Sequence, residues 1–298
     1  MTIKQTLKSA VTKLKKQSIM SAILDAEILL AYILKKNKEY LFTYPEKTLT
    51  KNQLSRFNKL IAKRSTGIPI AYLTHHKEFF GLDFYVNKNV LIPRPETELL
   101  VDETLKILNL LISQSSNFSP TIADIGTGSG AIPVAIASNV SAIRESRLHS
   151  LPIKILATDI SKPALKMATK NANLHATKIT FLHGNLLTPI KHKKIDIIVA
   201  NLPYVESTDL KKVTPNTIGL KFEPKDALYS GPDGLDAYRQ FFTQAAKLKH
   251  KPKFILIEYG GPQQTAELKK IIKAHFPTAK IQNKKDLCGL DRVIIIKL

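Results

Sequence analysis

Residues 200–205, Ala-Asn-Leu-Pro-Tyr-Val, place an amide, a proline and a tyrosine directly after an apolar run. That run, Ile195–Val199, has the composition of a buried strand. The simple interpretation is that Pro203 ends the strand, because proline cannot donate a ladder hydrogen bond. The alternative is chemical, since a short polar turn after a buried strand is a good place to hold a planar nitrogen.

Four consecutive residues in this turn have groups that can bind a planar nitrogen. The side chain of Asn201 and the carbonyl of Leu202 can accept the two hydrogens of an –NH₂ group. Pro203 fixes its own φ and restrains Leu202 to extended geometry, and Tyr204 supplies a flat face for stacking. Such a nitrogen, on a carboxamide or an adenine, is a poor nucleophile. Accepting hydrogen bonds from its N–H groups raises the electron density on the nitrogen and aligns it with a methyl donor. Catalysis would then come mainly from proximity and orientation.

Other reaction types lack support in the sequence. No cluster of His, Cys and Asp has metal-ligand spacing, so the sequence predicts no metal site. No Gly-x-Ser-x-Gly elbow for acyl transfer is present. The one cysteine, Cys288, excludes a disulfide framework and is expected to be a small buried residue in a reducing, cytosolic setting.

A glycine-rich segment, Asp-Ile-Gly-Thr-Gly-Ser-Gly at 124–130, follows an apolar run and opens a helical pattern. Its glycines allow a ligand to approach the backbone closely, but a Walker A lysine is absent. Asp159 ends the next apolar run, where a carboxylate can accept both ribose hydroxyls of a nucleoside. It can instead cap the helix that begins near Ser161, although Ser161 suits that position itself. NAD stays open, but the later amide motif favours S-adenosylmethionine.

A third apolar run ends at 183–187, His-Gly-Asn-Leu-Leu. Asn185 and Leu186 can hold and flank an adenine ring, and a plain turn explains the same residues. Short β-branched runs occupy 121–126, 154–160, 179–185, 194–201, 253–260 and 292–298, with a weaker one at 279–283. Helical patterns at 130–139, 162–174, 235–247 and 263–275 separate most of them. This alternation predicts a Rossmann-like α/β domain whose parallel sheet binds ligands beyond the carboxyl ends of its strands.

The first 70 or so residues instead have helical periodicity, with Ile3, Leu7, Val11 and Leu14 on one face. Between the two parts, Phe79–Pro95 alternates apolar and polar residues and predicts a β-hairpin. We therefore expect a helical bundle at 1–73, a β-hairpin linker at 74–94 and an α/β domain at 95–298. The bundle holds a partner or serves as a stabilising cap.

The chain has 298 residues and a formal net charge of +21, spread over both halves. Such a surface favours nucleic acid or acidic partners, or is simply a solvated lysine-rich surface. No stretch resembles a secretory signal or a transmembrane span.

Several longer segments are similar to one known family, the release-factor glutamine methyltransferases (HemK/PrmC). The segments that carry this resemblance are GIPIAYLTHHKEFFGLDFYVNKNVLIPRPETELL, DIGTGSGAI, ANLPYV, FEPKDALYSGPDGLDAYR and DLCGLDRV. They run from Gly67 to the C-terminus, and the helical region before them agrees in size and position.

The resemblance implies a seven-stranded class I methyltransferase fold. It also implies that methyl passes from S-adenosyl-L-methionine, leaving S-adenosyl-L-homocysteine, to the side-chain N5 of the glutamine in the Gly-Gly-Gln motif of class I peptide-chain release factors. This would modulate translation termination in the cytoplasm, with the enzyme acting as a monomer. The cofactor-binding residues implied are Gly126, Thr127, Gly128, Ser129, Gly130, Asp159, Leu186 and Asn201. The substrate-binding residues are Asn201, Leu202, Pro203 and Tyr204, with Asn201, Pro203 and Tyr204 also catalytic.

Three positions depart from the family pattern. Leu202 stands where the family has the first proline of Asn-Pro-Pro-Tyr, Asn185 replaces an acidic residue, and Tyr259 replaces an isoleucine. Leu202 keeps its carbonyl but gains an N–H and loses the fixed φ. The first departure can lower the rate, and neither Leu202 nor Asn185 removes a needed acceptor.

Two other functions remain open from the residues. An adenine-N6 methyltransferase of DNA or RNA would use the same four-residue turn and agrees with the charge of +21, although no target-recognition insertion is present. A binding module without turnover is suggested by the Leu202 departure. A ribosomal-protein glutamine is a further possible substrate.

Overall fold

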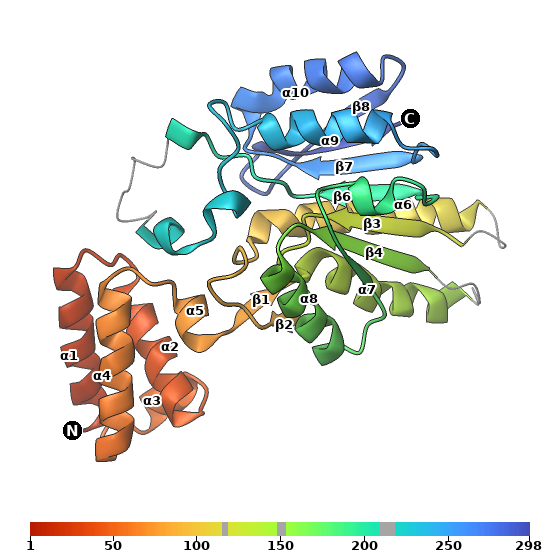
Figure 1. The fold of residues 1–298 in the computed structure, drawn as a ribbon. Helices are drawn as coiled ribbons and strands as arrows, with labels where there is room; N and C mark the ends of the chain where they lie inside the picture. The colour runs from red at the N-terminus through yellow and green to blue at the C-terminus, as the bar shows by residue number, and fades with distance from the viewer. Residues whose placement is uncertain (115–118, 148–152, 209–217) are drawn as a thin grey trace. The chain divides into compact units, whose positions relative to one another are not determined.

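The computed structural model describes residues 1–114, 119–147, 153–208 and 218–298 (Figure 1). These residues group into two compact units. One comprises Met1–His76 with residues 218–223, and the other comprises Lys77–Asp209 with Pro224–Leu298. Each unit has its own buried apolar cluster.

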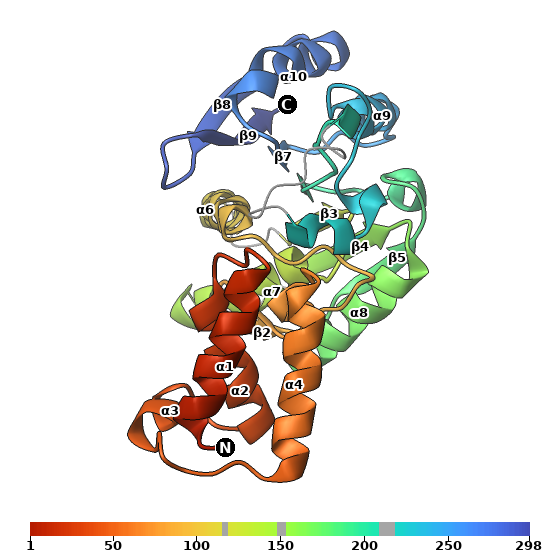
Figure 2. The same cartoon turned by 90° about the vertical axis from the view of Figure 1, so that its left-hand side faces the viewer.

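The N-terminal unit is helical, as the periodicity predicts. Its helices are α1 (Ile3–Lys16), α2 (Ala22–Leu34), α3 (Glu39–Thr43), α4 (Lys51–Ser65), α5 (Ile70–Thr74) and the 3-10 helix η4 (Ile218–Phe222). Capping boxes start two of them, Thr2 with Gln5 on α1 and Thr50 with Gln53 on α4. Helices α1, α2 and α4 lie side by side around a core of leucine and isoleucine (Figure 2).

Two contacts fasten this unit beyond its apolar core. Arg64 on α4 binds the buried carboxylate of Asp25 on α2 at 2.7 Å. Gly67 lies against Ile218 and Phe222, since a Cβ added at Gly67 would be 2.8 Å from the Ile218 side chain. Residues 218–223 therefore belong with this unit, whereas the sequence placed them in the α/β domain. Their apolar side chains find their partners here.

The second unit begins with an antiparallel hairpin, β1 (Lys77–Phe79) and β2 (Leu82–Phe84). The hairpin is shorter than the Phe79–Pro95 alternation predicted. Val86, Val90 and Ile92 continue the apolar pattern and are buried, but they form no strand. Burial alone explains the alternation there.

A seven-stranded sheet forms the centre of the second unit, in the order β5-β4-β3-β6-β7-β9-β8. The strands are β3 (Thr121–Ile125), β4 (Lys154–Asp159), β5 (Thr180–His183), β6 (Ile197–Ala200), β7 (Phe254–Glu258), β8 (Lys280–Lys285) and β9 (Asp291–Lys297). The first five strands in the sheet order are parallel to one another, and β9 pairs antiparallel with both β7 and β8. The Rossmann-like class predicted from the sequence is confirmed.

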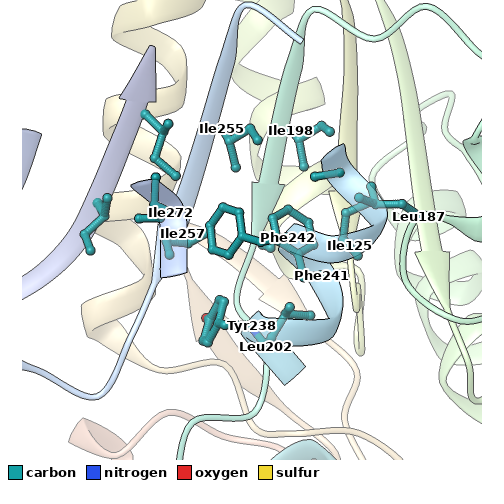
Figure 3. Close-up of a cluster of buried hydrophobic side chains, with 14 of the residues drawn as sticks. Ile125, Leu187, Ile198, Leu202, Tyr238, Phe241, Phe242, Ile255, Ile257 and Ile272 are labelled. Carbon is teal, nitrogen blue, oxygen red and sulfur yellow. The ribbon is translucent and has the colours of Figure 1, made fainter. Parts of the chain in front are cut away.

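Helices cover both faces of this sheet. They are α6 (Glu98–Ser113), α7 (Ala131–Arg147), α8 (Lys162–Leu174), α9 (Asp236–Ala246) and α10 (Pro262–His275), with 3-10 helices η1 (Pro95–Thr97), η2 (Thr188–Ile190) and η5 (Lys225–Ala227). Helix α7 packs with α6 and α8, while α9 packs with α10. Figure 3 shows Phe241 and Phe242 of α9 among Ile198, Ile255 and Ile257 of the strands, in one continuous core.

The strand register brings several strand ends to one edge of the sheet. Ile125 of β3 pairs with Thr158 of β4 and with Ala200 of β6. Ala200 in turn pairs with Ile257 of β7. The residues that follow these pairs therefore lie in adjacent positions, at the point where the chain order switches direction from β3.

Cys288 is exposed, so the expectation that it is buried is wrong. It lies in a turn where the Asp286 carboxylate accepts hydrogen bonds from the N–H groups of Cys288 and Leu290. Within the described ranges, no three acidic, histidine or cysteine side chains gather as a metal site. None of the described helices combines the length and apolarity needed to span a bilayer.

Candidate active site

The glycine-rich loop connects β3 to α7 at the carboxyl edge of the sheet. The carbonyl of Thr158 on β4 accepts hydrogen bonds from the N–H groups of Gly126 and Thr127, both at 2.9 Å. Gly126 has φ 74° and lies against Leu202, because a Cβ there would be 3.1 Å from the Leu202 Cδ2. The predicted cofactor loop and the predicted amide-binding turn are therefore neighbours.

The last residues of the loop, Ser129 and Gly130, contact helix α8. Gly128 has φ 55°, and a Cβ there would meet nothing within 4 Å, so space is open above it. Gly130 packs against Ala168 of α8. The carbonyl of the buried Ser129 accepts a hydrogen bond from the Asn171 amide at 2.8 Å. The loop thus presents its open side at Gly128.

Asp159, at the end of β4, is buried and closes over this loop. One carboxylate oxygen accepts the N–H of Gly128 at 2.8 Å, and the other accepts the N–H of Ser161 at 2.7 Å. Ser161 itself is the N-cap of α8, with its hydroxyl accepting from Ala164. Each Asp159 oxygen keeps a lone pair for a further donor. Burial raises the pKa of Asp159, and the two N–H donors oppose that rise.

A second carboxylate, Asp124, lies on β3 directly before the loop and is 1% exposed. Neither of its oxygens has a hydrogen-bond partner of normal geometry among the described residues. Burial raises the pKa of Asp124 to about 7, while the nearby Thr127 hydroxyl opposes the rise and Asp159 adds to it. Two buried acidic groups, Asp124 and Asp159, therefore lie beside the glycine-rich loop.

Replacing Asp124 with asparagine is expected to make the apo protein's stability less sensitive to pH. The folded protein holds this proton more tightly than the unfolded chain, whose ordinary pKa is 3.8. The contribution to stability is therefore fully present below about pH 4 and lost as pH rises through about 7. Thermal unfolding between these limits should show a smaller fall in Tm for Asp124→Asn than for the wild type. A parallel fall in both, as expected for the exposed control Asp102→Asn, would contradict this.

Leu186 lies after β5, where the sequence predicted a residue that flanks adenine. It has the left-handed φ of 49°. Its carbonyl accepts the Thr158 hydroxyl at 2.9 Å, and its side chain packs partly buried against the main core. The bond to Thr158 fastens the segment after β5 to the strand that ends in Asp159.

Asn201 follows β6 and is half-buried. Its Nδ2 donates to the hydroxyl of Thr97 at 3.1 Å. This bond turns the amide so that the Oδ1 atom is left to accept. No hydrogen bond to Oδ1 or to the Leu202 carbonyl is formed by the described residues. Two acceptors are thus free at the end of β6.

Tyr204 is fixed from both ends, and Pro203 is half-buried in the same turn. The Tyr204 hydroxyl donates to the Glu258 Oε1 at 3.1 Å, and its carbonyl accepts from Gln264 at 2.9 Å. Gly234 lies so close to this carbonyl that a Cβ there would be 2.1 Å from the oxygen. Val205 forms a bridge with Tyr229, so the segment around 224–236 encloses the turn. Burial, together with Glu258, raises the pKa of the Tyr204 hydroxyl.

Three residues that the sequence analysis did not single out support this turn: Thr97, Tyr238 and Glu258. Glu258 ends β7, is fully buried, and has one carboxylate oxygen without a partner among the described residues. Burial raises its pKa to about 7, and the hydroxyls of Thr97 and Tyr204 oppose that rise. Only Glu258 had a signal in the sequence, as an acidic residue at the end of an apolar strand.

The arrangement can bind a nucleoside-like cofactor beside a planar amide. Gly126–Gly130 and Asp159 lie next to the turn 201–204, all at one edge of the sheet. The buried acidic groups suit hydroxyls and positive charge, and they do not suit a pyrophosphate.

Comparison with known proteins agrees with this geometry. The PrmC N-terminal domain family matches residues 5–74, and the methyltransferase small domain family matches residues 101–219. The catalytic domain of hMettl16 in complex with hairpin 6 of the MAT2A 3'UTR has a TM-score of 0.54, covering 90% of this chain and 92% of that one. At 16% identity, this likeness concerns the fold alone.

Closer relatives cover almost the whole chain. The release factor glutamine methyltransferase of Moorella thermoacetica is 36% identical, over 99% of this chain and 98% of that protein. Its namesake from Bacillus anthracis is 34% identical, over 91% of both chains. That of Buchnera aphidicola subsp. Baizongia pistaciae is 36% identical, over 99% of both. This chain belongs to the release factor glutamine methyltransferase family.

Proposed function

We propose that this protein transfers a methyl group from S-adenosyl-L-methionine to the side-chain N5 of the glutamine in the Gly-Gly-Gln motif of class I peptide-chain release factors. Methylation there would modulate translation termination. The observation that carries the proposal is the pair of free acceptors at the end of β6, Asn201 Oδ1 and the Leu202 carbonyl, placed beside the glycine loop. The names of the close relatives support the choice of substrate.

The residues present fit this cofactor. Its cationic groups and ribose hydroxyls match the two buried carboxylates, Asp124 and Asp159, and the backbone of Gly126–Gly130 leaves room above Gly128. Leu186 would lie against the adenine. When bound, the cofactor supplies a methyl group on a sulfonium.

The chain's own residues would orient the nucleophile. Asn201 Oδ1 and the Leu202 carbonyl accept the two N–H bonds of the glutamine amide, and Pro203 and Tyr204 hold its plane. The glutamine nitrogen would bond to the methyl carbon as the bond from that carbon to the sulfonium sulfur breaks, which would leave S-adenosyl-L-homocysteine, and one amide hydrogen would be lost to water as a proton. Because hydrogen bonds fix Asn201, Leu202 and Tyr204 before substrate arrives, their contribution is orientation.

We infer that the helical N-terminal unit, predicted at 1–73, recognises the release factor, and that the α/β unit performs the transfer. The match of residues 5–74 to the PrmC N-terminal domain family supports this division. In this proposal the enzyme acts as a monomer in the cytoplasm, where translation terminates.

A methyl-transfer assay with four substrates tests this function. The substrates are a release factor, the same factor with its Gly-Gly-Gln glutamine replaced by alanine, duplex DNA and structured RNA. The expected result is transfer to the first substrate only. Transfer to nucleic acid alone would favour an adenine methyltransferase, for which the charge of +21 is the motive. Cofactor binding without any transfer would favour a binding module.

A further inference from the structure

The Leu202 N–H is a group that the family's proline would not have. Leu202 is 2% exposed, so this N–H is removed from water. A buried N–H without a hydrogen-bond partner is destabilising, because it loses its bond to water and gains none in return. The turn would therefore shift toward any conformation that satisfied it, and the free carbonyl of the same residue would move with it.

The hydroxyl of Tyr238 supplies the missing partner. It accepts the Leu202 N–H at 3.2 Å and donates to the backbone carbonyl of Glu258. Both roles of the hydroxyl are used at once, and the ring is completely buried in α9. Figure 3 shows Tyr238 beside Leu202, at the end of the core formed by Phe241 and Phe242.

The bond acts together with two other restraints on Leu202. Its side chain packs near Gly126, at 3.1 Å from the position of an added Cβ. Pro203 limits the ψ of the residue before it to extended values. Pro203 restrains the ψ of Leu202, and the hydrogen bond from the Leu202 N–H to Tyr238 restrains rotation about its φ. The direction of the Leu202 carbonyl is then defined.

We propose that Tyr238 is a positioning residue for methyl transfer, whose hydroxyl fixes Leu202 by a hydrogen bond where a proline ring would fix it covalently. The inference rests on the proposed function, because it concerns the carbonyl that accepts the substrate amide. It explains how this chain tolerates Leu202 in the motif.

A double-mutant cycle tests the inference in the full-length enzyme. It compares wild type, Tyr238→Phe, Leu202→Pro and the double variant, with kcat and KM measured on a release factor. Tyr238→Phe alone should lower kcat about tenfold or more, as expected for loss of a partner to a buried N–H. In the Leu202→Pro background, the same change should alter kcat by less than about twofold. The lost bond to Glu258 occurs in both backgrounds and cancels.

Leu202→Ala is the matched control, because it keeps the N–H. Tyr238→Phe should then lower kcat as strongly in Leu202→Ala as in the wild type. A similar loss from Tyr238→Phe in the Leu202→Pro background would overturn the inference and leave Tyr238 a purely structural residue.

Amide hydrogen exchange gives a second measurement that does not depend on turnover or on the proline variant. Exchange at Leu202 should be at least about tenfold faster in Tyr238→Phe, while β3 is unchanged. Unchanged exchange at Leu202 would contradict the anchoring. If the wild type methylates no release factor, the proposed function fails, and exchange still decides whether Tyr238 holds Leu202.

Discussion

Replacing Asn201 with alanine is expected to lower kcat for release-factor methylation by about 10²-fold or more, because it removes an orienting group. The bond to the Thr97 hydroxyl already orients the Asn201 side chain, so its Oδ1 atom is positioned to accept a hydrogen bond from the substrate. Alanine removes that acceptor and leaves the amide nitrogen held by one carbonyl. Single-turnover kinetics at saturating cofactor measure the change directly.

The matched control is Asn173→Ala, an exposed asparagine near the end of α8. It should leave kcat within about twofold of the wild type. Circular dichroism and thermal unfolding would confirm that both variants are folded. A folded Asn201→Ala enzyme with a near-normal rate would refute the account of the amide-binding turn.

The second large effect is expected on cofactor binding. Asp159→Ala should raise the Kd for S-adenosyl-L-methionine about 100-fold or more, since two hydrogen bonds to a carboxylate are worth about 1.5–3 kcal/mol each. The variant also frees the N–H groups of Gly128 and Ser161, which Asp159 now accepts. Isothermal titration calorimetry provides the measurement.

Asp159→Asn separates the loss of hydrogen-bond acceptors from the loss of charge, because asparagine keeps one acceptor oxygen and carries no charge. Its Kd should lie between those of the wild type and Asp159→Ala. Asp102→Ala, an exposed aspartate on α6, is the control and should bind as the wild type does. A Kd for Asp159→Ala within about threefold of the wild type would remove Asp159 from the cofactor site.

The sheet and the edge that carries the site could be predicted because they depend on local patterns. The β-branched runs identify buried strands, and parallel strands end at a common edge. Gly126 and Asn201 therefore had to lie near each other once β3 and β6 were neighbours, as their register confirms. The helical nature of the N-terminal unit followed from its periodicity in the same way.

The supporting contacts could not be predicted, because they join residues far apart in the chain. Thr97 reaches Asn201 from η1, and Tyr238 reaches Leu202 from α9. No spacing or periodicity links such pairs, since only the packing of separate elements brings them together. The hairpin was overestimated for a related reason, because buried positions such as Val86 continue the alternation but lie outside the strands of the described residues.

Residues 218–223 illustrate the same limit at the level of units. They follow the strand–helix alternation in sequence, but Ile218 and Phe222 pack against Gly67. Apolar residues in such a connecting segment indicate that they will pack against other apolar residues, but they do not indicate which unit supplies those residues.

Tandem mass spectrometry of a release factor incubated with the enzyme and S-adenosyl-L-methionine is the direct test of glutamine methylation. The Gly-Gly-Gln peptide should gain the mass of one methyl group, and fragmentation should place that group on the glutamine side chain. Asn201→Ala should abolish most of that signal under the same conditions. An unmodified glutamine after incubation with saturating cofactor and wild-type enzyme would contradict the account.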